Sequence, residues 1–311
     1  MKLATINRGT TGQPTASAPA IVIDDHVVDL SETLSAMKLA WHDLGDAFTA
    51  DGLTQLKELE GWATEQVAQG RSMHVNEVKF LPPVLRPSRI LAVAANYRAH
   101  VRETGTIEDA AREETAPWFF DMPQISMNPH HSPIILPAAL GQKIDWEAEL
   151  GVVIGKTTSK VSVETALDHV LGYTIINDIS ARSMEVPGRT KIRERDKFHD
   201  WLHGKWFDTF CCVGPWIVTA DEIGDPQGLM ISLSVNGERY QHAPTSDMLF
   251  TVAELISFAS HITTLQPGDL IATGTPSGVG KASGRFLTEG DVVEITIPGI
   301  GTLTNPVKAD A

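Results

Sequence analysis

The chain has 311 residues, 42% of them hydrophobic, and a formal net charge of −14 at pH 7. Such a composition is typical of a globular protein with one large domain or two, and the negative charge argues against nucleic acid and anionic membranes as partners. Its two cysteines, Cys211 and Cys212, are adjacent, which argues against a disulfide framework or a cysteine-rich zinc site. The sequence shows neither an apolar leader region nor an apolar run of membrane length, so we expect a cytoplasmic protein.

The first eighty residues carry no obvious chemistry. Their pattern predicts strands at 2–6, 20–23 and 26–30, a helix that begins at Ser31 and a second helix over 54–68. Two polar stretches, 9–19 and 106–115, are interpreted as a loop and as a solvated helix or mobile loop. The proline-rich stretch from Leu81 to Pro87 is a plausible linker, because proline cannot continue regular strand pairing. We therefore predict a small N-terminal α+β domain at 1–82 and a second, catalytic domain at 83–311.

A buried strand at 90–95 is expected to lead into a short helix that starts at Tyr97 and ends near Gly105. His100 and Glu103 are three residues apart on this helix, so their side chains can touch. A carboxylate beside an imidazole orients the ring and raises its basicity, as a general base requires. The alternative is a surface histidine with an incidental acidic neighbour. The apolar residues that follow, Trp118 to Phe120, are expected in the core.

Two glutamates, Glu147 and Glu149, stand two residues apart in the strand-like sequence IDWEAELGVVIGK. A strand turns alternate side chains to one face, so both carboxylates are expected to point the same way. After a short helical signal at 163–170, a second strand-like run at 173–176 leads to Asp178. A strand, a helix and a strand in this order can place Asp178 beside the two glutamates.

Three carboxylates that converge on an apolar layer would repel one another. A hard divalent cation removes this penalty, and Mg²⁺ and Mn²⁺ prefer oxygen ligands. The sequence therefore favours an Mg²⁺ or Mn²⁺ site at Glu147, Glu149 and Asp178. The alternative is a solvated polar strand face followed by an aspartate in a turn.

Lys205 lies in the sequence HGKWFDTF, between a glycine and aromatic residues that should pack. A lysine held there could stabilise a developing anion, although a lysine that extends to the surface gives the same pattern. The C-terminal third is rich in strands, with a hairpin signal at Asn236-Gly237 and an amphipathic helix at 252–260. Its TGTPSGVG loop could bind an anion through backbone N–H groups.

Eight sequence motifs occur in one order between about Pro87 and Val307, and together they resemble the fumarylacetoacetate hydrolase (FAH) superfamily, in particular bacterial acylpyruvate hydrolase-like members. They are RPSRILAVAANYRAHVRETG, IDWEAELGVVIGK, GYTIINDISAR, GKWFDTF, CVGPWIV, SVNGERYQHAPTSDMLF, PGDLIATGTPSGVG and GDVVEITIPGIGTLTNPV. The joint match is highly specific, although no single motif would be.

The resemblance implies an α+β, mostly β fold: a mixed β-sheet roll or open barrel with a small N-terminal domain, which assembles as a homodimer. It also implies Mg²⁺ or Mn²⁺ on Glu147, Glu149 and Asp178, and a place in aromatic catabolism. By the same resemblance His100, Glu103 and Lys205 are catalytic, and Arg182 and Thr275 bind substrate.

Three positions depart from the pattern of the family. Met122 stands where many relatives have a lysine, and Ser183 and Glu185 replace the aspartate and glutamine that usually follow the metal aspartate. A glutamate in place of a neutral amide near the substrate carboxylate should repel an acidic substrate, unless it is protonated or turned away. The segment 187–201 is also longer than in compact relatives.

Three hypotheses about function follow. The first is a metal-dependent hydrolase that cleaves a C–C bond in a β-diketo acid of the acylpyruvate or fumarylpyruvate type, with His100 as the base and the ion as a Lewis acid. The second keeps the site but decarboxylates a 2-oxo diacid or isomerises a related keto-enol. The third, motivated by the three departures, is a paralogue that binds a metabolite without turnover.

Overall fold

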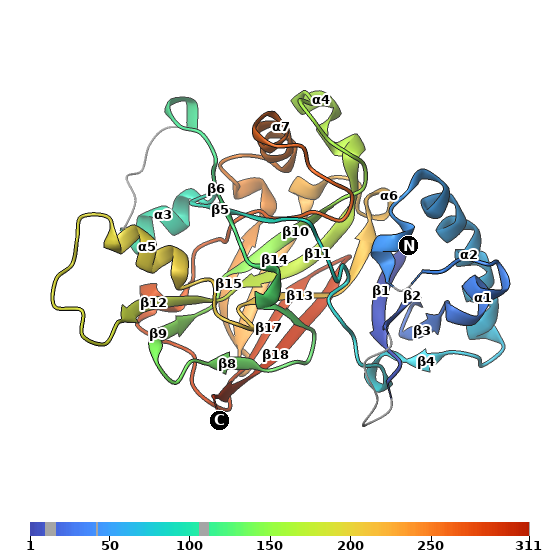
Figure 1. Ribbon diagram of the computed structural model, residues 1–311, viewed down its shortest axis with the longest axis horizontal. Coiled ribbons are helices and arrows are strands. Elements are labelled where there is room, and N and C mark those ends of the chain that lie inside the picture. Colours follow the sequence, from blue (N-terminus) through green and yellow to red (C-terminus); the bar gives the residue numbers. More distant parts are fainter. Residues whose placement is uncertain (10–16, 42, 106–111, 311) are drawn as a thin grey trace.

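The structure is a computed structural model that describes residues 1–9, 17–41, 43–105 and 112–310 (Figure 1). Its largest element is an eleven-stranded sheet with the order β4-β3-β2-β1-β13-β11-β10-β16-β5-β6, in which β7 also pairs with β13. The strands of this sheet are β1 (Lys2–Asn7), β2 (Ser17–Ile23), β3 (His26–Asp29), β4 (Met73–His74), β5 (Ile90–Ala94), β6 (Trp118–Asp121), β7 (Met127–Pro129), β10 (Ala148–Ile154), β11 (Val170–Asp178), β13 (Cys211–Thr219) and β16 (Leu270–Ala272).

Two smaller sheets complete the β-structure. A five-stranded sheet has the order β15-β14-β17-β18-β8, and a two-stranded ribbon pairs β12 with β9. Their strands are β8 (Ile134–Leu136), β9 (Leu140–Asp145), β12 (Ser180–Glu185), β14 (Met230–Val235), β15 (Glu238–Pro244), β17 (Val292–Ile297) and β18 (Gly301–Ala309). The predicted hairpin at Asn236-Gly237 joins β14 to β15, and both residues have the positive φ that a type I′ turn requires.

The helices lie around the sheets. They are α1 (Ser31–Ala36), α2 (Ala50–Ala68), α3 (Arg98–Thr104), α4 (Val163–Ala166), α5 (Asp196–His203), α6 (Ala220–Ile223), α7 (Val252–Ile262) and α8 (Gly280–Ser283). Short 3₁₀ turns are η1 (Leu44–Ala47), η2 (Val75–Glu77), η3 (Arg112–Glu114), η4 (Gln124–Ser126), η5 (Leu167–His169), η6 (Pro226–Gly228) and η7 (Thr245–Asp247). In Figure 1, α3 and α5 lie on the side of the molecule away from α1 and α2. No helix in the described ranges is long and apolar enough to cross a membrane.

The alternation of β10 explains how the layers pack. Leu150 and Val152 point into a core shared with the five-stranded sheet, whereas Val153 points to the other face, into a core shared with the N-terminal helices. Burying both faces gives the near-continuous apolar sequence of a central strand. The fold is therefore mixed, mostly sheet, and without a closed barrel among the described strands, as the sequence predicted.

The N-terminal strands extend the sheet of the second half of the chain, because β1 pairs antiparallel with β13. Phe80 packs edge-on against Trp216 and His130 across the same junction. The division into domains at residue 82 stays a prediction. The polar stretches expected at 9–19 and 106–115 fall largely outside the described residues.

The expectation that Trp118 to Phe120 lie in the core is wrong for Trp118, whereas Phe119 and Phe120 are half-buried and pack against the cores. Trp118 to Phe120 form β6, an edge strand, and the Trp118 side chain is 53% exposed. Apolar character alone did not reveal that this strand ends the sheet.

Candidate active site

The register of two central strands brings the three predicted acids together. Ala148 pairs with Asn177 in the antiparallel ladder of β10 and β11, and the N–H of Asp178 donates to the carbonyl oxygen of Glu147. Glu147 and Asp178 are thus opposite each other, and Glu149 follows on the same face. The predicted strand is interrupted at Trp146 and Glu147, between β9 and β10, yet both glutamates still point the same way. All three acids are buried, and one carboxylate oxygen of each lies within 4.8 Å of the others.

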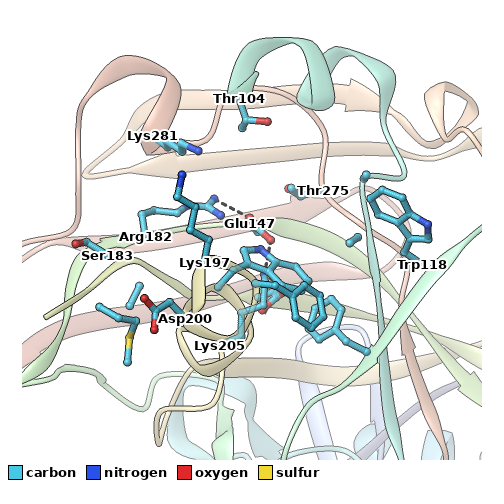
Figure 2. Close-up of a pocket in the computed structure, with 18 of the residues that line it drawn as sticks. Thr104, Trp118, Glu147, Arg182, Ser183, Lys197, Asp200, Lys205, Thr275 and Lys281 are labelled. Atoms are coloured by element: carbon cyan, nitrogen blue, oxygen red, sulfur yellow. Dashed lines mark hydrogen bonds and ion pairs between the residues drawn. The ribbon is translucent and has the colours of Figure 1, made fainter. Parts of the chain in front are cut away.

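Two cations compensate part of this charge (Figure 2). The Lys205 ammonium donates to Glu147 Oε2 at 2.9 Å, to Asp178 Oδ2 at 2.5 Å and to Ser180 Oγ at 2.9 Å. The Arg182 Nη2 lies 2.6 Å from Glu147 Oε1. Lys205 is only 2% exposed, which excludes a lysine that extends to the surface.

The three acids differ in how well their charges are compensated. Burial raises the pKa of Glu147, but Lys205 and Arg182 more than offset this effect and hold the pKa at about 2. Burial also raises the pKa of Asp178, and it stays at about 6 despite Lys205. Burial, then Asp178 and Glu147, raise the pKa of Glu149 well above its usual value. With all three acids ionised, the cluster would carry more negative charge than its cations neutralise, and the raised pKa values of Asp178 and Glu149 reflect this excess.

The cluster fits a hard divalent ion. Its donors are all carboxylate oxygens, the ligands that Mg²⁺ and Mn²⁺ prefer. Asp178 Oδ1 is buried and has no hydrogen-bond partner within the described part of the chain, which is costly for a carboxylate oxygen unless a cation binds it. Glu147, Glu149 and Asp178 are therefore the residues that could hold the ion.

The predicted pair His100 and Glu103 is formed on α3. His100 Nδ1 lies 3.0 Å from Glu103 Oε1, and both Glu103 oxygens accept from the N–H of Gly278, at 3.0 and 2.9 Å. The backbone of Gly278 has a φ of +103°, and an added Cβ would collide with the carbonyl oxygen of Tyr240. His100 lines the same cavity as the carboxylate cluster, and its charge, if present, would act on Glu147.

The loop from Gly274 to Lys281 binds carboxylates of the protein itself. The N–H of Gly274 donates to Glu149 at 2.7 Å, and the N–H groups of Gly280 and Lys281 donate to Asp145 at 2.6 and 3.0 Å. With the contact to Glu103, this loop fixes three acids from three separate segments. The loop that TGTPSGVG predicted to bind an anion thus donates its N–H groups to carboxylates from other segments of the protein.

Asp145 is a residue that the sequence did not single out. Its Oδ2 accepts from Arg182 Nε at 2.7 Å, so it holds the guanidinium that contacts Glu147. Thr275 also faces the cavity, and its hydroxyl donates to the carbonyl oxygen of Ala148 and accepts from Gln241. Gln241 was missed as well, since an isolated glutamine in a hairpin strand carries no sequence signal for a site 34 residues away.

The carboxylates and the histidine share a cavity of about 630 Å³. Of the three departures from the family pattern, Ser183 lines it, whereas Glu185 is exposed on β12 and does not. Met122 is buried in the core against the N-terminal half of the molecule. The expected repulsion of an acidic substrate by Glu185 therefore has no structural basis in this cavity.

Comparisons with known proteins agree with this site. Residues 89–308 match the family described as fumarylacetoacetate (FAA) hydrolase C-terminal. A 2,4-didehydro-3-deoxy-L-rhamnonate hydrolase from Sphingomonas sp. (strain SKA58) is 42% identical over 75% of this chain and 77% of its own length. An oxaloacetate tautomerase from Bacillus subtilis (strain 168) is 36% identical over 92% of this chain and 94% of its own length. A maleylpyruvate hydrolase from Sphingobium sp. SYK-6, solved with manganese(II) and pyruvate, aligns over the full length of both chains with a TM-score of 0.75 and 29% identity. The chain belongs to the fumarylacetoacetate hydrolase family.

Proposed function

We propose that this protein is a divalent-metal-dependent hydrolase that cleaves the C–C bond of a β-diketo acid of the acylpyruvate type. The observation that carries the proposal is the pair His100–Glu103, fixed by Gly278 and facing a buried carboxylate cluster in one cavity. A base held beside a metal site is what activation of water requires. Mg²⁺ or Mn²⁺ bound to the cluster would act as a Lewis acid towards the 2-oxo acid part of the substrate.

In this proposal His100 takes a proton from water while the water oxygen bonds to the distal carbonyl carbon. The bond between that carbon and the neighbouring methylene then breaks, and its electron pair goes to the pyruvate part, which leaves as an enolate and takes up a proton. The other product is a carboxylic acid. Glu103 keeps the imidazole oriented and stabilises its positive charge once it holds the proton.

Lys205 is proposed to stabilise the negative charge on the attacked carbonyl oxygen. An ammonium has three N–H donors, and all three of Lys205 are used on Glu147, Asp178 and Ser180. A direct contact with substrate therefore requires that one of them is released. A cation on the two carboxylates would weaken their hold on the ammonium.

A second candidate is keto-enol tautomerisation or decarboxylation of a 2-oxo diacid. It is favoured by the 36% identity to an oxaloacetate tautomerase over 92% of this chain. It needs the same carboxylate cluster but no attacking water. The cavity of about 630 Å³ is large for a four-carbon diacid, which favours the longer acylpyruvates.

A panel of acylpyruvates and oxaloacetate, each assayed with Mg²⁺ and Mn²⁺, tests the proposal. The expected result is release of pyruvate and of one carboxylic acid in equal amounts from an acylpyruvate. Accelerated enolisation or decarboxylation of oxaloacetate, with every acylpyruvate left intact, would show that the second candidate is right. Turnover of any 2-oxo acid excludes a protein that only binds a metabolite.

A further inference from the structure

Two lysines in the cavity wall form no ion pair within the part of the chain that the structure describes. Lys197 lies in the first turn of α5 and Lys281 in α8, and both side chains are exposed to the cavity. Neither ammonium forms an ion pair with any residue of the described ranges. Figure 2 shows both on the same side of the cavity as Arg182, with Trp118 on the opposite side.

The acids of the cavity wall are already used elsewhere. Asp200 accepts two hydrogen bonds of 2.7 Å from the guanidinium of Arg189, and the remaining three are the predicted metal ligands. Burial and the positive charge of Arg182 lower the pKa of Lys281 more than the charges of Asp145 and Glu147 raise it. In a chain with a net charge of −14, two lysines without an ion pair in the described ranges form a local patch of positive charge.

Much of the remaining cavity wall is apolar. It includes Trp118, Phe120, Phe198 and Trp201, which contribute aromatic rings to the cavity. Such a surface suits a short carbon chain, and charged groups at its two ends would fix the chain's orientation.

We propose that Lys197 and Lys281 form an anion subsite for a second carboxylate at the distal end of the substrate, so that β-diketo dicarboxylates are preferred over acylpyruvates with a neutral tail. This inference rests on the proposed function for the position of the 2-oxo acid end. The two lysines are specificity-determining residues, and Arg182 lies between them and the reacting end.

Binding of two non-cleavable 2-oxo acids of equal length tests the subsite. 2-Oxoadipate and 2-oxohexanoate differ only in the distal carboxylate, and titration calorimetry on the Mn²⁺-loaded protein measures both without turnover. We expect 2-oxoadipate to bind at least about tenfold more tightly. Lys281→Met and Lys197→Met should each reduce this preference about three- to tenfold, since a contact with a partly exposed charge is of modest strength.

Two further variants control the measurement. Lys308→Met removes an equal charge from an exposed position on β18 outside the cavity and should leave the preference within about twofold. Lys281→Arg keeps the charge and should keep the preference. Equal binding of the two acids, or equal loss of both in Lys281→Met, would overturn the inference.

The outcomes also separate this inference from the proposed function. A preference for 2-oxoadipate that the lysine variants abolish, without cleavage of any acylpyruvate, would leave the subsite standing and reject the hydrolase. Cleavage of acylpyruvates with neutral and anionic tails at equal efficiency would support the hydrolase and reject the subsite. Failure of every 2-oxo acid to bind would reject both.

Discussion

The two ends of the cavity are built in opposite ways. At the inner end, Glu147 and Asp178 are held by strand register, are buried, and contact cations on neighbouring elements. At the outer end, Lys197 and Lys281 lie on short helices, are exposed, and have no acidic partner in the described structure. On the proposed function, the sheet carries residues that would hold the ion, whereas short helices carry the proposed base and the lysines proposed to select the substrate.

The strongest way to break this comparison is to remove an inner ligand. Glu147→Ala should abolish activity and weaken Mn²⁺ binding while the fold persists. In the native protein, EDTA should abolish activity, and added Mg²⁺ or Mn²⁺ should restore it. Activity assays and titration calorimetry measure the two effects. Glu185→Ala, an exposed acid outside the cavity, is the matched control. Full activity in a verified metal-free preparation would contradict the metal assignment.

Removal of the base should divide the two candidate reactions. His100→Ala should slow acylpyruvate cleavage about 10²–10⁴-fold, the usual contribution of a positioned base. Decarboxylation of oxaloacetate, if present, should fall far less, because no water has to be deprotonated. Rates of pyruvate release and of oxaloacetate loss for one preparation give the comparison. Cleavage within about twofold of the wild type would mean that His100 is not the base.

A smaller loss of cleavage is expected when His100 is kept but the residue that orients its imidazole is changed. Glu103→Gln keeps an acceptor for Gly278 but loses the charge that orients His100, so cleavage should fall by about tenfold, less than in His100→Ala. Mn²⁺ affinity should not change, because Glu103 is not among the clustered acids. An equal loss of metal binding would show that α3 and the carboxylate cluster are not independent.

The smallest effect tests whether the buried carboxylates destabilise the inner end when no ion is bound. Glu149→Gln keeps the shape and the acceptor for Gly274 but removes the least compensated charge of the cluster. The melting temperature of the metal-free protein should rise by about 2 °C or more, since function and stability conflict at such sites. Addition of Mn²⁺ should raise the melting temperature of the wild type but no longer that of the variant. A lower melting temperature in the metal-free variant would show that the Glu149 carboxylate does not destabilise the metal-free protein.

The sequence predicted the fold, the clustering of the three acids and the His100–Glu103 contact better than the contacts that hold them. Spacing placed Glu147 and Glu149 on one face, and the i, i+3 rule paired His100 with Glu103, because both depend on local geometry. The contact of Asp145 with Gly280 joins residues 135 apart in the chain, so no local pattern could reveal it.

The same limit explains what was wrong or incomplete. An apolar run such as Trp118 to Phe120 predicts a strand, but its burial depends on whether another strand covers it, and β6 ends the sheet. The glycines of TGTPSGVG predicted a loop whose N–H groups bind anions, and the loop does donate N–H groups to carboxylates. The anions turned out to be Glu103 and Glu149, which only the three-dimensional structure could show.

The loop from Gly274 to Lys281 has a consequence for how this enzyme family could diversify. One short segment carries N–H donors for Glu103, Asp145 and Glu149, so a deletion or insertion inside it would disturb three functions at once. In the described structure, the segment between β12 and α5 bonds to the neighbouring Met184, Asp196 and Asp200 and not to these three acids, so a change in its length need not disturb them. New substrates are therefore easier to acquire through that segment than new chemistry is through the loop.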